Sequence, residues 1–173
     1  MLDTIERAPT LSRRRFANDA VTLAPSPPVW RLSVRSKDRD AANRALSMDL
    51  PSEPNRSWRG NGAVALWLGP DEWLVIGETN DAPAWPDGVA AVDVSHRNAA
   101  IVVSGEGAAD ALAAGCPRDL RLLAFPVGAC ARTILGKAEV VLLREDDDTF
   151  RVECWRSFAP YVWAFLEDAA TGL

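Results

Sequence analysis

Histidine, cysteine and tyrosine are scarce in this 173-residue chain, which contains one histidine, three cysteines and one tyrosine. The histidine, His96, directly follows Ser95, and neighbouring side chains on an extended chain point to opposite faces, so the two cannot pair as base and nucleophile. There is no second histidine for a metal site and no G-x-S-x-G motif. We therefore expect no catalytic residue, no bound cofactor and no metal ligand in this chain.

The three cysteines, Cys116, Cys130 and Cys154, are odd in number, lie far apart and stand among apolar residues. Neither a C-x-x-C pair nor a metal-ligand spacing connects them. We expect buried, reduced thiols, which favours a reducing cytoplasmic location.

An excess of positive charge is also missing, because 19 basic residues face 24 acidic ones and the formal charge is −5. A net-acidic chain lacks the broad positive field on which sequence-independent nucleic-acid binding depends. No apolar run reaches the roughly 18 residues of a membrane span, and the N-terminal sequence lacks the apolar block of a secretory signal. We therefore expect neither a nucleic acid nor a membrane as partner.

Apolar residues make up 48% of the chain and include seven tryptophans, a composition typical of a globular domain. Residues 1–28 have no periodicity, carry three successive arginines from Arg13 to Arg15 and contain prolines near their end, so they predict an extended N-terminal arm. Residues 29–173 predict a single domain built of two lobes, about 29–91 and 92–173.

Hydrophobic alternation and capping signals predict an α+β fold with mainly antiparallel sheets and a C-terminal helix. The predicted strands are 29–35, 63–68, 73–77, 98–104, 130–135, 139–144 and 150–155. Three helices are predicted. The first begins after an N-cap at Asp38, the second spans 107–114, and the third has Ser157 as its N-cap. Between the first helix and the strand at 63–68, the sequence from Met48 to Gly62 predicts a loop.

The two predicted hairpins, AVALWLGPDEWLVIG (63–77) and EVVLLREDDDTFRVE (139–153), have similar patterns. Each joins an apolar strand through an acidic turn to a return strand that opens near an aromatic residue, and each follows a strand–helix unit. This similarity is compatible with two duplicated β-α-β-β lobes in one fold. Chance similarity between two hairpins is an equally good explanation.

The final predicted helix carries an apolar stripe at helical spacing, widened by Trp163, so it needs cover on more than one side. Either another protein chain or the arm of residues 1–28 supplies that cover. Tryptophans in two predicted loops add to the apolar contact surface. The candidate contacts with a partner protein are Trp58, Trp85, Phe158, Tyr161, Trp163 and Phe165.

Two further segments only superficially resemble ligand sites. Gly105-Glu106-Gly107 lies between a strand and a helix as in a dinucleotide-binding turn, but Asp110 stands where the third small residue belongs. The acidic run from Glu145 to Asp148 lacks the glycine and the terminal glutamate of a calcium-binding loop. We interpret the acidic run as a solvated turn.

Segment 93–120, DVSHRNAAIVVSGEGAADALAAGCPRDL, resembles the start of the folate-binding fold of aminomethyltransferases. There an Asp-x-Ser stretch leads into a strand, a Gly-x-x-Ala turn and a helix that ends before Asp-Leu. The surrounding motifs extend the resemblance, which runs from Val29 to Ala170, to the γ subunit family of heterotetrameric sarcosine oxidase. Those motifs are LGPDEWL (68–74), FPVG (125–128), CART (130–133), RSFA (156–159) and YVW (161–163).

The resemblance implies a small subunit of a bacterial flavoenzyme complex that oxidatively demethylates sarcosine to glycine. In that family the β subunit carries FAD and FMN, the α subunit supplies NAD and tetrahydrofolate sites, the δ subunit binds zinc, and the γ subunit has no recognised catalytic residue. We therefore expect α, β and δ subunits as partners. The alternatives are a folate-dependent one-carbon transferase, the equivalent subunit of a related N-methyl amine demethylase, and a free-standing sensor or adaptor.

Overall fold

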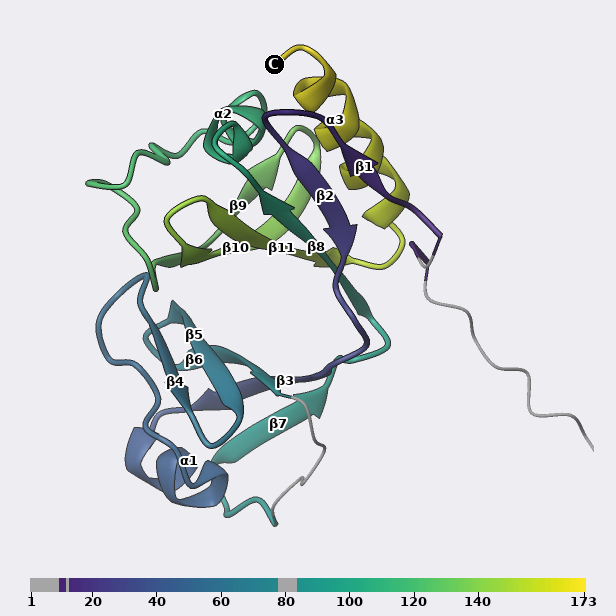
Figure 1. The fold of residues 1–173 in the computed structure, drawn as a ribbon. Coiled ribbons are helices and arrows are strands. Elements are labelled where there is room, and N and C mark those ends of the chain that lie inside the picture. Colours follow the sequence, from purple (N-terminus) through teal and green to yellow (C-terminus); the bar gives the residue numbers. More distant parts are fainter. Residues whose placement is uncertain (1–9, 12, 78–83) are drawn as a thin grey trace, which may run out of the picture.

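The computed structural model describes residues 10–11, 13–77 and 84–173 (Figure 1). Every pair of neighbouring strands in these residues is antiparallel. The elements in chain order are β1 (Phe16–Ala17), β2 (Thr22–Pro25), β3 (Trp30–Ser36), α1 (Arg39–Leu46), β4 (Ser57–Gly60), β5 (Ala63–Gly69), β6 (Glu72–Gly77), β7 (Val89–Asp93), β8 (Asn98–Ser104), α2 (Ala108–Ala113), β9 (Cys130–Leu135), β10 (Ala138–Asp146), β11 (Thr149–Trp155) and α3 (Ala159–Thr171).

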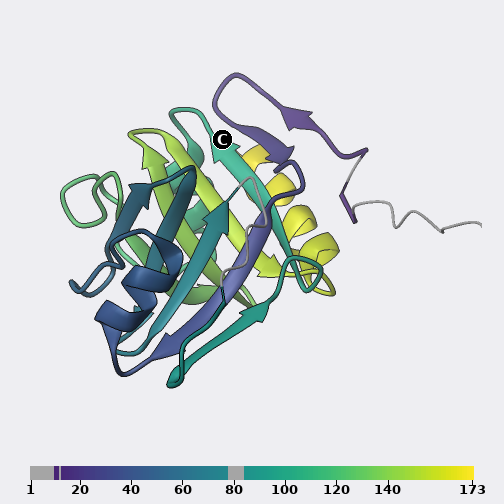
Figure 2. The ribbon, with the colours of Figure 1, turned by 90° about the horizontal axis from the view of Figure 1, so that it is seen from below.

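The strands form two sheets that pack against each other (Figures 1 and 2). The first sheet has the order β4-β5-β6-β3-β7, and the second sheet has the order β1-β2-β8-β11-β10-β9. Helix α1 lies on the outer side of the first sheet, whereas α2 and α3 lie on the outer side of the second sheet (Figure 1). The fold class expected from the sequence, α+β with antiparallel sheets and a C-terminal helix, is confirmed.

The two halves of the chain repeat one topology. Four neighbouring strands have the order β4-β5-β6-β3 in the first sheet and β9-β10-β11-β8 in the second, and a short helix follows β3 and β8. Trp73 lies opposite Val34 in the first sheet as Phe150 lies opposite Val103 in the second. Both central hairpins also have a register shift next to their turn. The similarity between the two hairpin sequences therefore reflects a shared structure.

Each sheet also contains a strand that, in the sequence, directly precedes the first strand of the other half. Strand β2 runs directly into β3 but pairs with β8, and β7 runs directly into β8 but pairs with β3. The two connections are joined where they cross, because the Val94 amide donates to the Arg31 carbonyl (2.9 Å) and the Arg31 amide donates to Ser95 Oγ (2.9 Å). This exchange of strands makes the two halves one packed unit.

Three apolar clusters fill the spaces between the layers. One lies between the second sheet and helices α2 and α3 and includes Phe150 and Leu166. Another is built around Trp73 and lies between the first sheet and α1. The third joins the sheets to each other and includes Leu66 from the first and Leu143 from the second.

One predicted helix cap is right and one is wrong. Asp38 caps α1, because its Oδ1 atom accepts a hydrogen bond from the Ala41 amide (2.9 Å). Phe158, not Ser157, occupies the N-cap position of α3, and no side chain caps that end. Pro160 stands in the first turn of α3, where it removes one N–H group that would otherwise lack a partner.

Four strands have no clear signal in the sequence. Strands β1, β4 and β7 lie at sheet edges, where one face or one side of the strand meets solvent, and their residues do not alternate cleanly. Strand β4 lies within the segment predicted to be a loop, residues 48–62. Strands β1 and β2 lie in the arm predicted for residues 1–28, of which residues 1–9 and 12 lie outside the described residues.

The described part of the arm packs against the ends of α3 and α2. Asn18 Nδ2 donates to the Ala170 carbonyl (2.9 Å), and the Gly107 amide donates to the Ala20 carbonyl (3.0 Å). A Cβ atom at Gly105, whose φ is +111°, would lie 2.3 Å from the Ala20 oxygen, so this position requires glycine. Gly105 and Gly107, whose sequence resembles a dinucleotide-binding turn, therefore pack against the backbone of the arm.

Candidate functional site

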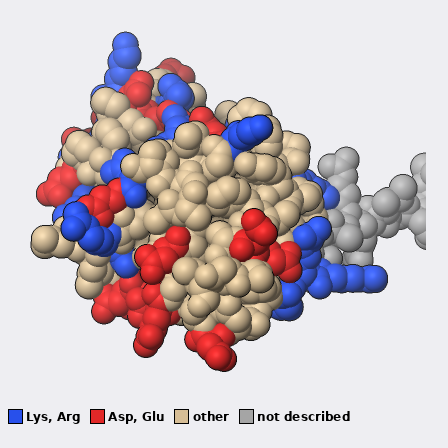
Figure 3. All heavy atoms as spheres, turned by 90° about the horizontal axis from the view of Figure 1, so that it is seen from above, with Lys and Arg blue, Asp and Glu red and all other residues tan. Residues whose placement is uncertain are grey.

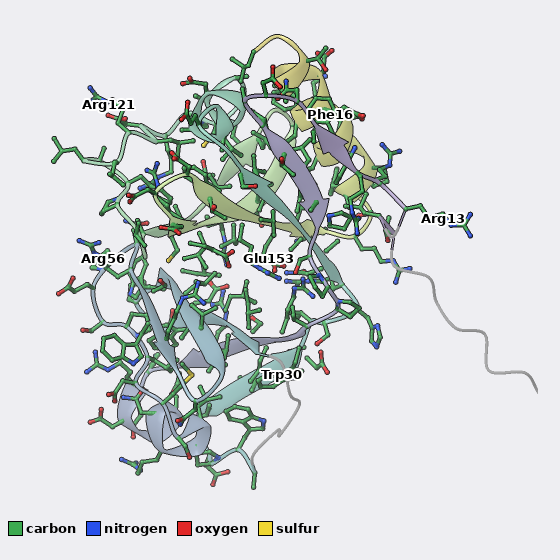
Figure 4. All side chains as sticks on the ribbon, in the orientation of Figure 1. Arg13, Phe16, Trp30, Arg56, Arg121 and Glu153 are labelled. Atoms are coloured by element: carbon green, nitrogen blue, oxygen red, sulfur yellow. The ribbon has the colours of Figure 1, made fainter. Side chains whose placement is uncertain are left out.

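Helix α3 is covered largely by its own chain. Trp163 is only 1% exposed and lies in the same buried cluster as Leu11, while Phe16 of β1 packs against that cluster (Figure 4). Trp163, predicted from the sequence to contact a partner, is instead enclosed by its own chain, in the cluster between the second sheet and helices α2 and α3. Phe165 packs onto the end of α2, where a Cβ atom at Gly115 would lie 2.4 Å from the Phe165 ring.

Three aromatic residues from the end of β11 to the first turn of α3, Trp155, Phe158 and Tyr161, form what we call the aromatic patch. They are 46%, 42% and 38% exposed, respectively. The Trp155 and Phe158 rings lie 6.3 Å apart, and the Arg97 guanidinium lies 5.5 Å from the Trp155 ring. The Tyr161 hydroxyl accepts a hydrogen bond from the Lys137 amide (3.0 Å). These contacts order an exposed apolar surface, in which Trp155 is the member that sequence reasoning missed.

The two remaining predicted contacts lie on the other half of the molecule. Trp58 on edge strand β4 is 53% exposed and lines a shallow hollow together with Arg39 and Arg56. Trp85 is partly buried against the cluster between the first sheet and α1. The predicted contacts therefore do not form one surface, since these two belong to the first half and the others to α3.

Arg144 fixes the loop between α2 and β9, which we call the 119–128 loop. Its side chain is 4% exposed and donates to the carbonyls of Leu120 (2.9 Å), Phe125 (2.6 Å) and Asp147 (2.7 Å). The guanidinium also lies 4.5 Å from the Phe150 ring. Burial lowers the pKa of Arg144, but its three carbonyl acceptors satisfy the charged form. The base of this loop is therefore built into the core.

The tip of the 119–128 loop presents leucines to solvent. Leu122 is 46% exposed and Leu123 is 98% exposed, and the loop projects from the body of the molecule (Figures 1 and 2). Beside them Arg121 pairs with Asp119, and the hydrogen bonds from Arg121 lower the pKa of Asp119 to about 2. Apolar side chains held out on an ordered loop are typical of a protein contact. Sequence periodicity does not mark this segment, because its leucines have no helical or strand spacing.

Three charged side chains are buried between the sheets and form the Arg31–Glu153–Arg151 cluster. Their exposed fractions are 4%, 2% and 7%, and Figure 4 shows Glu153 in the layer between the sheets. Arg31 Nε donates to Glu153 Oε2 (2.6 Å), and Arg151 Nε donates to Glu153 Oε1 (2.8 Å). The cluster connects β3 of the first sheet with β11 of the second and contains two guanidiniums for one carboxylate.

His96 is exposed at the rim of a cavity of about 500 Å³ that Ser95 and Arg31 also line. Ser95 Oγ accepts from the Arg31 amide (2.9 Å) and so serves the connection between the halves. Within residues 10–11, 13–77 and 84–173, no group of three or more His, Cys, Asp or Glu side chains is placed to hold a metal ion. In the same part of the chain, no helix has both the length and the hydropathy to cross a membrane.

The three cysteines are free and buried, as the sequence predicts. Burial raises the pKa of Cys130 and of Cys154 to about 12. The Cys130 thiol donates to the Arg56 carbonyl, with a sulfur–oxygen distance of 3.2 Å. Because only a thiolate is an effective nucleophile, these protonated thiols are packing groups.

The chain matches one established family model, described as the sarcosine oxidase, gamma subunit family, over residues 37–172. The chain belongs to this family. Among curated gamma subunits, it is 31% identical to that of Corynebacterium sp. strain U-96 and 31% identical to that of an Arthrobacter species. These matches cover 63% and 73% of this chain, and they span 57% and 66% of the respective relatives.

A solved structure agrees with this family assignment. A chain of the heterotetrameric sarcosine oxidase from Corynebacterium sp. U-96 superposes with a TM-score of 0.87 at 25% identity, covering 96% of this gamma-family chain and 95% of that chain. Aminomethyltransferase T of the glycine cleavage system from Bartonella henselae has a TM-score of 0.67 at 14% identity, with 85% of this chain and 45% of that chain covered. The second likeness shows the fold alone, and it confirms the expected aminomethyltransferase-like architecture.

Proposed function

We propose that this chain is a non-catalytic structural subunit of a heterotetrameric sarcosine oxidase. The observation that carries the proposal is the likeness, over 96% of this chain, to a chain of such an enzyme. The proposed complex oxidatively demethylates sarcosine to glycine in the cytoplasm. Its FAD and FMN belong to the β subunit, its NAD and tetrahydrofolate sites to the α subunit and its zinc to the δ subunit.

The chemistry of the described residues supports a structural role. Cys130 and Cys154 are kept protonated by burial, and Ser95 serves a backbone hydrogen bond. Glu153 and Arg144 are engaged in contacts that hold the sheets and the 119–128 loop. These polar groups maintain the fold, and the reacting groups of the complex belong to other subunits.

The 119–128 loop and the aromatic patch are the surfaces that we assign to subunit contacts. An ordered loop that exposes Leu123 almost completely can bury that side chain in a partner with little loss of conformational freedom. Aromatic side chains such as Trp155 and Tyr161 are enriched where protein–protein contacts are strongest. Figure 3, which looks onto the end with α2 and α3, shows an uncharged area bordered by both acidic and basic side chains.

Reconstitution tests the proposed function. The α, β and δ subunits are co-expressed with and without this chain, and sarcosine-dependent oxygen uptake is measured on the particle isolated by size-exclusion chromatography. We expect a four-subunit particle that oxidises sarcosine, no activity of this chain alone, and failed or incomplete assembly when the chain is omitted. Full assembly and full turnover without this chain would contradict a structural role.

The same preparations decide between the alternatives. A folate-dependent one-carbon transferase would bind tetrahydrofolate as an isolated chain, so calorimetric titration should show binding heat if that alternative is right. We expect no heat above background from the isolated chain. A complex that oxidises another N-methyl amine faster than sarcosine would assign the chain to a related demethylase.

A further inference from the structure

Strand β7 is an open edge of the first sheet. It pairs with β3 on one side and, among the residues that the structure describes, with no strand on the other (Figure 2). The edge strands β4 and β9 meet each other, because the Ser57 amide donates to the Gly128 carbonyl (2.9 Å) and the Cys130 amide to the Asn55 carbonyl (2.9 Å). Edge strand β1 has two residues, whereas β7 has five. Strand β7 is therefore long enough to pair with another strand.

The sequence of β7 carries none of the features that usually protect an open edge. Natural proteins place lysine, proline or a bulge on such edges to prevent pairing with other chains. Strand β7 reads Val-Ala-Ala-Val-Asp, its register with β3 has no shift, and its one charged residue, Asp93, stands at its end. Ala90 and Val92 are exposed, and the exposed fraction of Val92 is 60%. A regular, apolar and exposed edge of this kind favours the addition of a strand.

The hydrogen bonds to β3 show which backbone groups of β7 are left over. In an antiparallel pair of strands, hydrogen-bonded residue pairs alternate with pairs that are not bonded. The Val94 amide donates to the Arg31 carbonyl (2.9 Å), so every second residue from there, Val92 and Ala90, also bonds to β3. The other residues of β7 direct their N–H and C=O groups away from the sheet. These residues are Val89, Ala91 and Asp93.

We propose that β7 pairs with β7 of a second copy of this chain, antiparallel and centred on Ala91. In this register Ala91 exchanges both backbone hydrogen bonds with Ala91 of the second copy. The Asp93 amide of each copy donates to the Val89 carbonyl of the other. The Val89 amide needs no new acceptor, because it already donates to the Pro86 carbonyl (3.1 Å).

The pattern of β7 fits its own copy because it is symmetric about Ala91. A two-fold axis at this residue gives each outward group a counterpart from the same strand. Asp93 then lies opposite Val89 of the second copy, so like charges do not face each other. Val92 lies opposite Ala90 of the second copy in a close, non-bonded pair, where a larger apolar side chain meets a small one. The two first sheets thereby become one continuous sheet. This inference concerns the isolated chain and does not rest on the proposed function.

Sedimentation equilibrium of the full chain tests whether the pairing occurs. A contact made by one short strand is small, so we expect a weak, reversible dimer with a dissociation constant on the order of 100 μM. The mass should rise from 18.8 kDa toward twice that value as the protein concentration is raised from about 5 μM to about 1 mM. A monomer throughout this range would overturn the proposal.

Amide hydrogen exchange followed by NMR locates the contact. The Ala91 and Asp93 amides should exchange rapidly at low protein concentration and at least severalfold more slowly at high concentration. The Ala90 and Val92 amides, which bond to β3, should be protected at both concentrations. A dimer in which exchange at Ala91 does not slow would place the contact elsewhere and overturn the assignment.

Two variants test the pairing without disturbing the ladder between β3 and β7. Ala91→Pro removes an N–H group that points away from β3, and Val92→Lys places a charge on the edge, so each should weaken dimerisation about tenfold or more. Ile134→Lys is the matched control, because Ile134 is 49% exposed on edge strand β9 and should leave dimerisation unchanged. Urea unfolding confirms that each variant is folded. If Val92→Lys dimerises as well as Ile134→Lys does, self-pairing through β7 is wrong.

The same exchange measurement on the assembled oxidase distinguishes a different occupant of the edge. If the isolated chain stays monomeric and the Ala91 amide is protected only in the complex, a strand of a partner subunit pairs with β7. That result would overturn self-pairing and leave the proposed function intact.

Discussion

Glu153 links the two sheets through a buried ion cluster. Its carboxylate accepts hydrogen bonds from two buried arginines on different sheets. Replacing a whole buried ion cluster by apolar residues is often neutral, but removing one partner leaves uncompensated charge in a medium of low polarity. The cluster therefore fixes how the two sheets face each other more than it adds net stability.

We expect Glu153→Gln to lower the free energy of unfolding by about 3–5 kcal/mol, because Arg31 and Arg151 then stay buried without a counter-charge. Glu139→Gln, at an exposed position on neighbouring strand β10, should change it by less than about 0.5 kcal/mol. Urea unfolding of both variants measures the difference. A loss below about 1 kcal/mol in Glu153→Gln would mean that water or a rearranged side chain already compensates the arginines.

The buried thiols predict a dependence of stability on alkaline pH. Burial raises the pKa of Cys130 and of Cys154 from 9.0 to about 12, so above pH 9 the unfolded chain releases protons that the folded chain keeps. Stability contributed by the protonated thiols is fully present below pH 9 and is lost as the pH rises toward 12. The free energy of unfolding should fall more steeply between pH 9 and 11 in the natural chain than in a Cys130→Ala, Cys154→Ala variant. Equal slopes would show that the thiols titrate alike in both states.

At the scale of elements, helix α3 and its N-cap carry both residues that pack within the fold and residues that stay exposed for a partner. Phe165 packs against the backbone of Gly115, whereas Phe158 is 42% exposed at the start of the helix. Both belong to the same apolar stripe in the sequence. The turn after α2 and the β9–β10 turn lie against the Phe165 ring, so Phe165 is the more buried of the two.

We expect Phe165→Ala to lower the free energy of unfolding of the isolated chain by about 2–4 kcal/mol, because a packed ring is lost at a helix–turn contact. Phe158→Ala should lower it by less than about 1 kcal/mol. Chemical denaturation of the two variants provides a matched comparison on one helix. Similar losses for both residues would mean that Phe158 is part of the core.

Strands with strong alternation and marked ends are predictable from the sequence, whereas elements completed by distant segments are not. The sequence predicts strand 98–104 and the Asp38 cap because the relevant residues are local. Trp163 is buried in a cluster of residues from distant segments of the chain, and the pairing of β2 with β8 joins segments about 80 residues apart, so neither has a local signal. Arg151 and Glu153 alternate with core residues of β11, a pattern that indicates a solvent-facing side, and only the packing of the first sheet on that side shows that they are buried.

At the scale of the whole molecule, two topologically similar halves exchange strands and enclose a charged layer. The two connections cross near Arg31 and Ser95. The second sheet contains β2, which leads into the first half, and the first sheet contains β7, which leads into the second half, so separate folding of either half is unfavourable. Two of the apolar surfaces that this arrangement leaves exposed are the 119–128 loop and the aromatic patch. Both stand on rigid parts of the structure, as a docking subunit requires.

We expect Leu122→Asp with Leu123→Asp to abolish or strongly reduce incorporation into the oxidase while leaving the unfolding free energy within about 0.5 kcal/mol. Val92→Asp on edge strand β7 is the control, because Val92 is 60% exposed but lies outside both assigned surfaces. Size-exclusion chromatography of the co-expressed complexes measures incorporation. Equal incorporation of the double variant and the control would remove the 119–128 loop from the contact.

Affinity purification of the tagged chain from its native host, grown on sarcosine, tests the central claim most directly. We predict that it co-purifies with flavin-carrying chains in a fixed ratio and that the isolated particle consumes oxygen when sarcosine is added. Recovery of the chain as a stable, monodisperse monomer, while sarcosine oxidase activity elutes without it, would contradict the account.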